Sequence, residues 1–133
     1  MAVLLVEDDT VVRLTLGEFL EDAGLQIIEA GNARAAMEIL ADPSSRISIL
    51  VTDLNLGSGD DGLMLAAKAR ASLPDLQVVY ATGSPDRLAG RRLALWEKVF
   101  IKPFDPAVLA AVVSQLNARL DQRRPALAAA VAH

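Results

Sequence analysis

The feature that most constrains the fold is the alternation of short apolar runs with stretches of helical periodicity. The first run, residues 2–6, is apolar without a break, which indicates a strand buried on both faces. Further short apolar runs follow, and the predicted strands cover residues 2–6, 25–29, 47–52, 76–81 and 98–101. Strands that alternate with helices favour a parallel sheet covered by helices on both faces. We therefore expect an α/β fold, a doubly wound five-stranded parallel sheet with (βα)5 order.

Capping residues place the helices between these strands. Thr10 and Asn32 are expected to be the N-caps of the first two helices, and Asp105 the N-cap of the last, with Pro106 in its first turn. A helix is also expected over residues 86–96, between the last two strands. The final helix is expected to end at residues 123–125. These boundaries predict one domain over residues 1–122 and an Ala-rich, flexible tail over residues 123–133.

Composition removes several classes of function. The chain has 133 residues, no cysteine and a net charge of −4. A disulfide framework, a cysteine zinc site and a thiol nucleophile are therefore excluded, and the acidity argues against a nucleic-acid partner. The single histidine, His133, is the last residue, which argues against a Ser-His-Asp triad. No apolar run approaches the roughly 20 residues that cross a membrane, and no signal peptide is evident, so we expect a cytoplasmic protein with no membrane partner.

Charged and hydroxyl side chains gather where four of the five predicted strands end. In a doubly wound sheet, ligands bind beyond the carboxyl ends of the strands. Each of these side chains alone has an ordinary explanation, because a chain that leaves a buried strand reaches solvent. Together they are chemically complementary, and they comprise Glu7, Asp8 and Asp9 after the first strand, Asp53 after the third, Thr82 after the fourth and Lys102 after the fifth.

This set of side chains suits phosphoryl transfer. Carboxylates that share one sheet edge repel one another and need a counter-charge, which Mg²⁺ with its preference for oxygen ligands would supply. An aspartate such as Asp53 can act as a nucleophile and form an aspartyl phosphate. Lys102 would pair with an oxygen of the transferring group, and the Thr82 hydroxyl would donate a hydrogen bond to another.

Four segments in this order and spacing resemble the receiver domain of two-component response regulators. They are VLLVEDD at residues 3–9, LVTDLN at 50–55, VYATG at 79–83 and FIKPF at 100–104. Each segment is a weak signal alone, and together they are a strong one, with a resemblance that runs over about residues 2–120. The resemblance implies a flavodoxin-like fold.

The resemblance also implies a role for each matching residue. Asp53 corresponds to the phosphoacceptor, Thr82 to the switch hydroxyl and Lys102 to the cation that pairs with the phosphoryl group, followed by a cis bond to Pro103. The implied magnesium ligands are Asp8 directly, Glu7 through water, Asp53 itself and the backbone carbonyl of Asn55, with Asp9 a weaker candidate.

The chain departs from the family pattern at three positions. Gly57 stands where proline is usual, in a loop that looks one residue longer, so we expect a more mobile backbone there. Gly83 replaces the usual alanine after Thr82 and is expected to leave the phosphate more accessible. Val99 stands where the family has its switch aromatic, so we expect weakened switching.

The implied partners are a histidine kinase or histidine phosphotransfer protein as donor, and a downstream protein as receiver of the signal. The output face would lie on the helix over residues 86–96, the strand that follows it and the final helix, and would include Arg87, Arg91, Arg92, Trp96 and residues near Gln115. No output domain follows, so a stand-alone receiver is favoured, although a receiver cut from a hybrid kinase would look the same.

Two rival functions compete with this interpretation. A magnesium-dependent phosphohydrolase with an aspartyl nucleophile, of the haloacid dehalogenase type, would need a second aspartate where this chain has Asn55, which cannot act as an acid or base. A phosphorylation-independent pseudo-receiver would usually lack the acidic or lysine positions, and here both are retained. A flavodoxin-like nucleotide-binding protein is weaker still, because no Gly-rich loop follows the first strand.

Overall fold

Five parallel strands form one sheet at the centre of the molecule. The computed structural model describes residues 1–57 and 59–132, with the side chains of residues 123–132 left out of the description. The strand order across the sheet is β2-β1-β3-β4-β5, and the pairings are all parallel. The strands are β1 (Ala2–Val6), β2 (Gln26–Ala30), β3 (Ile47–Thr52), β4 (Gln77–Thr82) and β5 (Glu97–Ile101). The doubly wound sheet is therefore as predicted, with strand boundaries within one residue.

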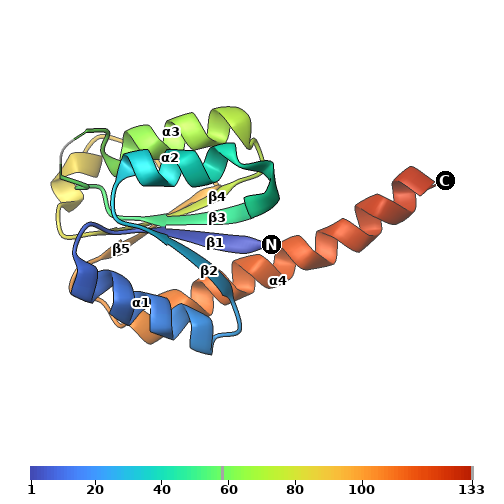
Figure 1. Ribbon diagram of the computed structural model, residues 1–133, viewed down its shortest axis with the longest axis horizontal. Coiled ribbons are helices and arrows are strands. Elements are labelled where there is room, and N and C mark those ends of the chain that lie inside the picture. The colour runs from blue at the N-terminus through green and yellow to red at the C-terminus, as the bar shows by residue number, and fades with distance from the viewer. Residues whose placement is uncertain (58, 133) are drawn as a thin grey trace.

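Helices cover both faces of this sheet. α1 (Thr10–Asp22) and α4 (Pro106–Ala132) lie on one face, and α2 (Ala33–Ala41) and α3 (Gly62–Ser72) lie on the other (Figure 1). Short 3₁₀ turns, η1 (Pro43–Ser45) and η2 (Pro85–Leu88), complete the elements. Because every strand runs in the same direction, the carboxyl ends of all five meet at one edge of the sheet.

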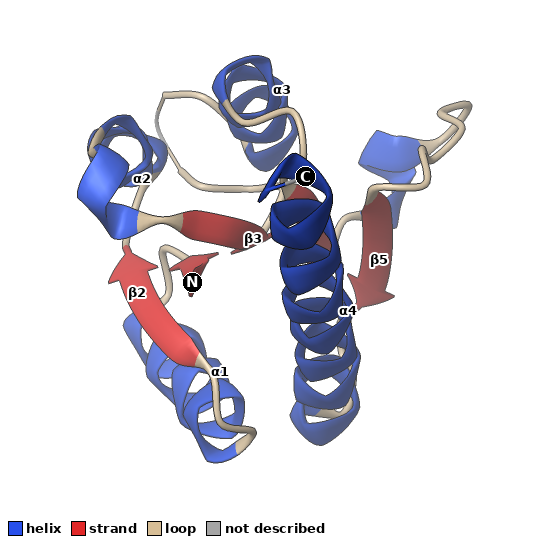
Figure 2. Cartoon of the chain, turned by 90° about the vertical axis from the view of Figure 1, so that its right-hand side faces the viewer, coloured by secondary structure: helices blue, strands red, loops and turns tan. Residues whose placement is uncertain are grey.

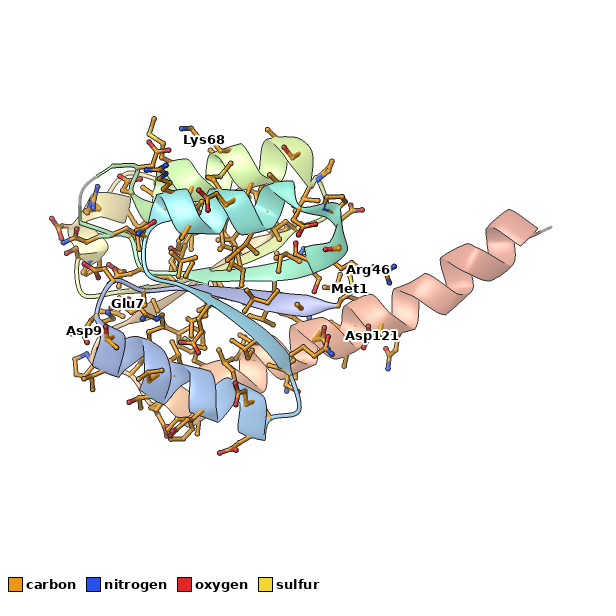
Figure 3. All side chains as sticks on the ribbon, viewed as in Figure 1. Met1, Glu7, Asp9, Arg46, Lys68 and Asp121 are labelled. Carbon is orange, nitrogen blue, oxygen red and sulfur yellow. The ribbon has the colours of Figure 1, made fainter. Side chains whose placement is uncertain are left out.

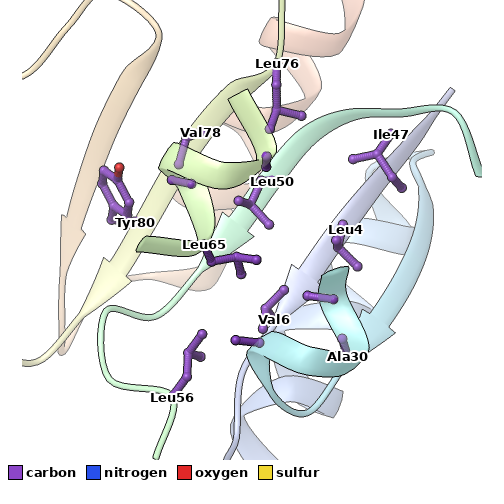
Figure 4. Close-up of a cluster of buried hydrophobic side chains, with 14 of the residues drawn as sticks. Leu4, Val6, Ala30, Ile47, Leu50, Leu56, Leu65, Leu76, Val78 and Tyr80 are labelled. Atoms are coloured by element: carbon purple, nitrogen blue, oxygen red, sulfur yellow. The ribbon is translucent and has the colours of Figure 1, made fainter. Parts of the chain in front are cut away.

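Each face of the sheet has its own hydrophobic core. Leu4, Val6, Leu50, Val78 and Tyr80 point toward α2 and α3, and several of them are seen in Figure 4. The alternate residues of the same strands point toward α1 and α4, where they pack on Leu16, Leu20, Leu109 and Val113, among others. β1 and β3 are buried along their whole length, which explains why their sequences show no polar alternation.

The first helix begins one residue earlier than predicted. The N-cap of α1 is Asp9, whose carboxylate accepts hydrogen bonds from the backbone N–H groups of Val11 and Val12. Thr10, the expected cap, is instead the first helical residue. Asp and Thr are both common caps, and Asp has the advantage that its negative charge is favourable at a helix N-terminus. Asn32 and the Asp105 side chain bind the first turns of α2 and α4, as expected.

The helix expected over residues 86–96 does not form. Only the 3₁₀ turn η2 is helical there, and residues 89–96 follow an irregular path beside the edge strand β5 (Figure 2). Gly90 adopts a φ of +75°, which is left-handed and interrupts a right-handed helix. The described α-helices are therefore four rather than five, and the face assigned to that helix is built from a turn and a loop.

A buried carboxylate holds this loop in place. Glu97, at the start of β5, has a side chain that is 1% exposed. One of its oxygens accepts hydrogen bonds from the Tyr80 hydroxyl (2.6 Å) and from Arg91 (3.2 Å), and the other accepts one from the backbone N–H of Ala94 (3.0 Å). Burial and the bond to Glu97 raise the pKa of the Tyr80 phenol well above its ordinary value. Tertiary contacts thus override the local preference of residues 86–96 for a helix.

Removing the phenol oxygen of Tyr80 should therefore destabilise the protein. Tyr80→Phe leaves a buried carboxylate without one of its donors, so we expect the free energy of unfolding to fall by about 2 kcal/mol. Urea unfolding followed by circular dichroism would measure the change. Tyr80→Phe with the stability of the parent chain would show that the Tyr80–Glu97 bond does not contribute.

The last helix continues beyond its predicted end. We expected residues 123–125 to stop it, but α4 runs to Ala132 and projects past the sheet (Figure 1). A proline removes only one backbone hydrogen bond from a helix, and the alanines and leucine that follow it in the sequence are strong helix formers, which favours continuation of the helix. The flexibility predicted for residues 123–133 stays a prediction, and His133 lies outside the described residues. No helix among the described residues is both long and apolar enough to span a membrane.

Candidate functional site

The carboxyl edge of the sheet gathers the predicted site residues. Glu7 directly follows β1, Asp53 directly follows β3 and Lys102 directly follows β5, while Thr82 is the last residue of β4. Figure 3 shows Glu7 and Asp9 at this edge of the molecule, with Arg46 and Met1 at the opposite edge. The strands therefore bring together residues that are up to 95 positions apart in the chain.

Three carboxylates form the acidic part of the site. Glu7, Asp8 and Asp53 each offer one oxygen, and these oxygens all lie within 4.8 Å of one another. Glu7 and Asp53 are buried, whereas Asp8 is exposed. Asp9, the weaker candidate, is engaged as the cap of α1 and is not part of this group.

Lys102 provides the positive charge. Its Nζ lies 2.9 Å from Oδ2 of Asp53 and 3.5 Å from Oε1 of Glu7. Burial alone lowers the pKa of Lys102, but the hydrogen bond to Asp53 and the charge of Glu7 outweigh that effect and hold the pKa above its ordinary value. The Lys102–Pro103 bond is cis, as the resemblance implies, and the Lys102 backbone N–H donates to the carbonyl of Thr82 (2.8 Å). Lys102 therefore remains a cation beside two buried carboxylates.

Three carboxylates beside one lysine leave the cluster with a formal excess of negative charge, and Glu7 is the member whose pKa is raised. Burial raises the pKa of Glu7, Lys102 lowers it and the Asp53 carboxylate raises it again, with a result of about 7. Asp8 adds a further repulsive charge. Three oxygen donors with incomplete neutralisation, one of them open to solvent, are suited to a hard divalent cation. The residues present thus fit the metal that the resemblance implies.

Asn55 lies in the loop that follows β3. Its backbone N–H donates to Oδ1 of Asp53 (3.1 Å), and its side-chain oxygen accepts from the backbone N–H of Gly57 (3.3 Å). Gly57 adopts a φ of +78°, which glycine reaches without strain. Both oxygens of Asp53 are therefore held, one by Asn55 and the other by Lys102.

Thr82 is close in the fold but is turned to a different partner. Its side chain is fully buried, and its Oγ1 accepts a hydrogen bond from the backbone N–H of Ser84 (2.9 Å). No hydrogen bond joins Thr82 to Asp53 among the described residues. The Thr82 hydroxyl therefore lies at the end of β4 and forms no hydrogen bond with the described carboxylates of the cluster.

The sequence analysis missed Arg13, which supports the acidic residues. From α1, its Nη1 donates to the backbone carbonyl of Glu7 (2.8 Å), and its Nε lies 3.4 Å from Oε1 of Glu29. Glu29 is in β2, the strand whose end carried no evident chemistry. Glu29 was the only signal in the sequence, as an acid near the end of a strand with no evident role. In the structure, β2 contributes to the site because Glu29 orients Arg13, and Arg13 holds the turn after β1 through the Glu7 carbonyl.

Gly62, at the start of α3, is required by close packing behind Asp53. A Cβ at this position would lie 2.1 Å from the Asp53 carbonyl oxygen and 3.0 Å from Cα of Leu54, all of them backbone atoms. The Gly62 N–H also donates to the Leu54 carbonyl (2.9 Å). No side chain can rotate away to relieve this contact, so α3 can begin here only with glycine.

Gly62→Ala is accordingly expected to destabilise the protein by about 3 kcal/mol, because backbone must shift to admit the methyl group. Chemical denaturation would measure the loss. Gly83→Ala is the matched control, since a Cβ at Gly83 meets nothing within 4 Å. Equal stability of the two variants would contradict this account of the loop.

Comparisons with known proteins agree on one family. A family model described as "Response regulator receiver domain" matches residues 3–114. The response regulator receiver protein CpdR of Brucella abortus is 35% identical over 108 residues, which cover 77% of this chain and 84% of CpdR. The phyllosphere-induced regulator PhyR of Methylorubrum extorquens is 30% identical over 116 residues, which cover 85% of this chain and only 42% of PhyR. The chain thus spans less than half of that larger relative.

Solved structures show the same likeness. The response regulator receiver protein from Sinorhizobium medicae superposes with a TM-score of 0.80 at 30% identity, and covers 90% of this chain and 96% of its own. The receiver domain of the hybrid histidine kinase CckA gives a TM-score of 0.72 at 28% identity, and the match covers 86% of this chain and 97% of the CckA receiver. The similarity therefore extends over nearly the whole of each receiver domain.

Proposed function

Because this chain belongs to the response regulator receiver domain family, we propose that it accepts a phosphoryl group on Asp53 from a phosphohistidine donor. The observation that carries this proposal is the position of Asp53 between Lys102 and the carboxylates of Glu7 and Asp8. An aspartate so placed has a cation on one side and a candidate metal site on the other. Charge that develops on a transferring phosphoryl group would be neutralised from both.

The transfer requires few covalent steps. The phosphorus–nitrogen bond of the donor breaks, a bond forms between phosphorus and a carboxylate oxygen of Asp53, and the imidazole leaves with the electron pair. Lys102, already 2.9 Å from Asp53, would pair with an oxygen of the incoming group. Asp8, Glu7, Asp53 and the Asn55 carbonyl would hold Mg²⁺, which supplies charge neutralisation when bound. The buried Thr82 hydroxyl would exchange its Ser84 partner for the phosphoryl group.

The same proposal gives the chain a regulatory role and not that of an enzyme with a separate substrate. Phosphorylation would shift an equilibrium between two conformations, and a downstream protein would bind one of them. The surface near η2, residues 89–96 and β5 is the candidate output face, and it presents the exposed Arg91, Arg92 and a fully exposed Leu95. Histidine kinases and their phosphotransfer proteins are the expected donors, and the cytoplasm is the expected compartment.

Transfer from a phosphohistidine protein tests the donor class. A histidine phosphotransfer protein carrying ³²P-phosphohistidine would be mixed with the chain and Mg²⁺, and the label followed on a denaturing gel. We expect label to move to the chain, up to one equivalent, and to be released by hydroxylamine, as an acyl phosphate is. If all label stayed on the histidine donors while a small acyl phosphate still labelled Asp53, the proposed class of donor would be wrong, but the assignment of Asp53 as acceptor would stand. Continued release of inorganic phosphate from a phosphorylated metabolite would instead support the phosphohydrolase alternative.

A further inference from the structure

A second arginine outside the predicted site reaches into the loop that follows Asp53. Arg87 lies in η2, five residues after Thr82. Its Nη2 lies 2.5 Å from Oδ2 of Asp61, and its Nη1 donates to the backbone carbonyl of Leu54 (3.3 Å). One guanidinium therefore joins the segment after β4 to two points of the segment after β3.

These two points are the ends of the loop over residues 54–62. The Leu54 carbonyl also accepts the Gly62 N–H, and Asp61 caps α3 through its other oxygen by accepting from Met64 N–H (2.8 Å). Leu54 itself is fully buried. Arg87 thus binds the closed base of the loop, and Asn55, which follows Leu54 directly, donates its backbone N–H to Asp53.

We propose that Arg87 is a positioning residue that fixes the loop carrying Asn55 against the segment that follows Thr82. The inference rests on the proposed function, and it adds a residue that acts through Leu54 and Asp61 rather than on the phosphoryl group. The planar guanidinium fork can hold a carbonyl and a carboxylate at once, which a lysine cannot do with the same geometry. Arg87 thereby holds the loop that carries Asn55 at a fixed position relative to the segment that follows Thr82.

The alternative is that Arg87 only adds stability through a surface ion pair. Its side chain is 37% exposed, and exposed ion pairs usually contribute little to stability. Arg34 in α2 offers a matched comparison, because it forms an exposed ion pair with Glu38 of the same helix at 3.8 Å. Arg34 lies beside Gly59 and Asp60 of the loop after Asp53, but among the described residues its ion pair is with Glu38 of its own helix. Arg87 differs because it forms a hydrogen bond and an ion pair with that loop.

Arg87→Ala is expected to weaken Mg²⁺ binding about tenfold, as loss of a group that orients metal ligands commonly does. Isothermal titration calorimetry with Mg²⁺ alone gives this value. Hydrogen exchange should become faster at residues 55–57, 59–61 and 83–88 but not in β1 or α1. The rate of phosphorylation at saturating Mg²⁺ should change less than the Mg²⁺ concentration needed for half of that rate.

Asp61→Asn keeps the oxygen that caps α3 but removes the charge that faces Arg87, so it should weaken Mg²⁺ binding in the same direction. The double variant should bind Mg²⁺ no more weakly than Arg87→Ala alone, and Arg34→Ala should bind it normally. Equal Mg²⁺ affinity and equal loop exchange in Arg87→Ala and Arg34→Ala would overturn the proposal. The metal and exchange measurements need no phosphorylation, so they test Arg87 even if Asp53 accepts no phosphoryl group.

Discussion

Lys102→Ala is expected to slow phosphorylation of Asp53 by about a hundredfold or more, the size of effect seen when one preorganised donor to a developing negative charge is removed. Lys102 contacts both Asp53 and Glu7, and no other lysine or arginine among the described residues forms an ion pair with either carboxylate. The rate would be measured by intact mass at saturating Mg²⁺ and saturating small-molecule phosphodonor.

The matched control is Lys98→Ala, near the start of β5, which should leave this rate unchanged because Lys102 follows the other end of that strand. Binding of Mg²⁺ by Lys102→Ala should be retained or strengthened, because the carboxylates lose their competing cation. A Lys102→Ala variant phosphorylated at the parent rate would show that this lysine does not stabilise the transferring group.

Asp8→Asn is expected to weaken Mg²⁺ binding by about a hundredfold or more, since Mg²⁺ is usually held by only one or two carboxylates and the loss of one removes much of the attraction. Asp8 is the exposed member of the cluster, so it is the carboxylate that an entering cation meets first. The same change should not reduce the stability of the metal-free protein, because it removes a repulsive neighbour of Glu7. Calorimetric titration and urea unfolding would measure the two effects.

The adjacent residue supplies the control for this experiment. Asp9→Asn should leave Mg²⁺ binding nearly intact, because Asp9 caps α1 and asparagine is an equally good cap. The same substitution at two neighbouring aspartates should thus weaken Mg²⁺ binding strongly at Asp8 and hardly at Asp9. If both variants bound Mg²⁺ as the parent chain does, Asp8 would not be a ligand.

The site could be predicted from the sequence because parallel strands impose it. Once β1, β3 and β5 were recognised as strands of one parallel sheet, the residues that follow them had to share one edge of the sheet. That geometry placed Glu7, Asp53 and Lys102 together without knowledge of any contact. Arg13 and Arg87 could not be predicted in this way, because their partners are backbone carbonyls and distant acids that leave no spacing pattern.

Local patterns were least reliable where tertiary contacts decide the path of the chain. Residues 86–96 have helical composition, yet Gly90 and the buried Glu97 keep most of the segment irregular. At the start of α1, two neighbouring residues could both have been the cap, and Asp9 rather than Thr10 takes that place. The weakened switching expected from Val99 stays a prediction, and Val99 pairs in the sheet with Tyr80, which is bound to Glu97.

The most direct measurement is the intact mass of the chain after incubation with a small-molecule phosphodonor and Mg²⁺. We predict that the parent chain gains the mass of one phosphoryl group, that chelation of Mg²⁺ prevents the gain, and that Asp53→Ala shows none. Absence of any gain in the parent chain, or an undiminished gain in Asp53→Ala, would contradict the assignment of Asp53 as phosphoacceptor.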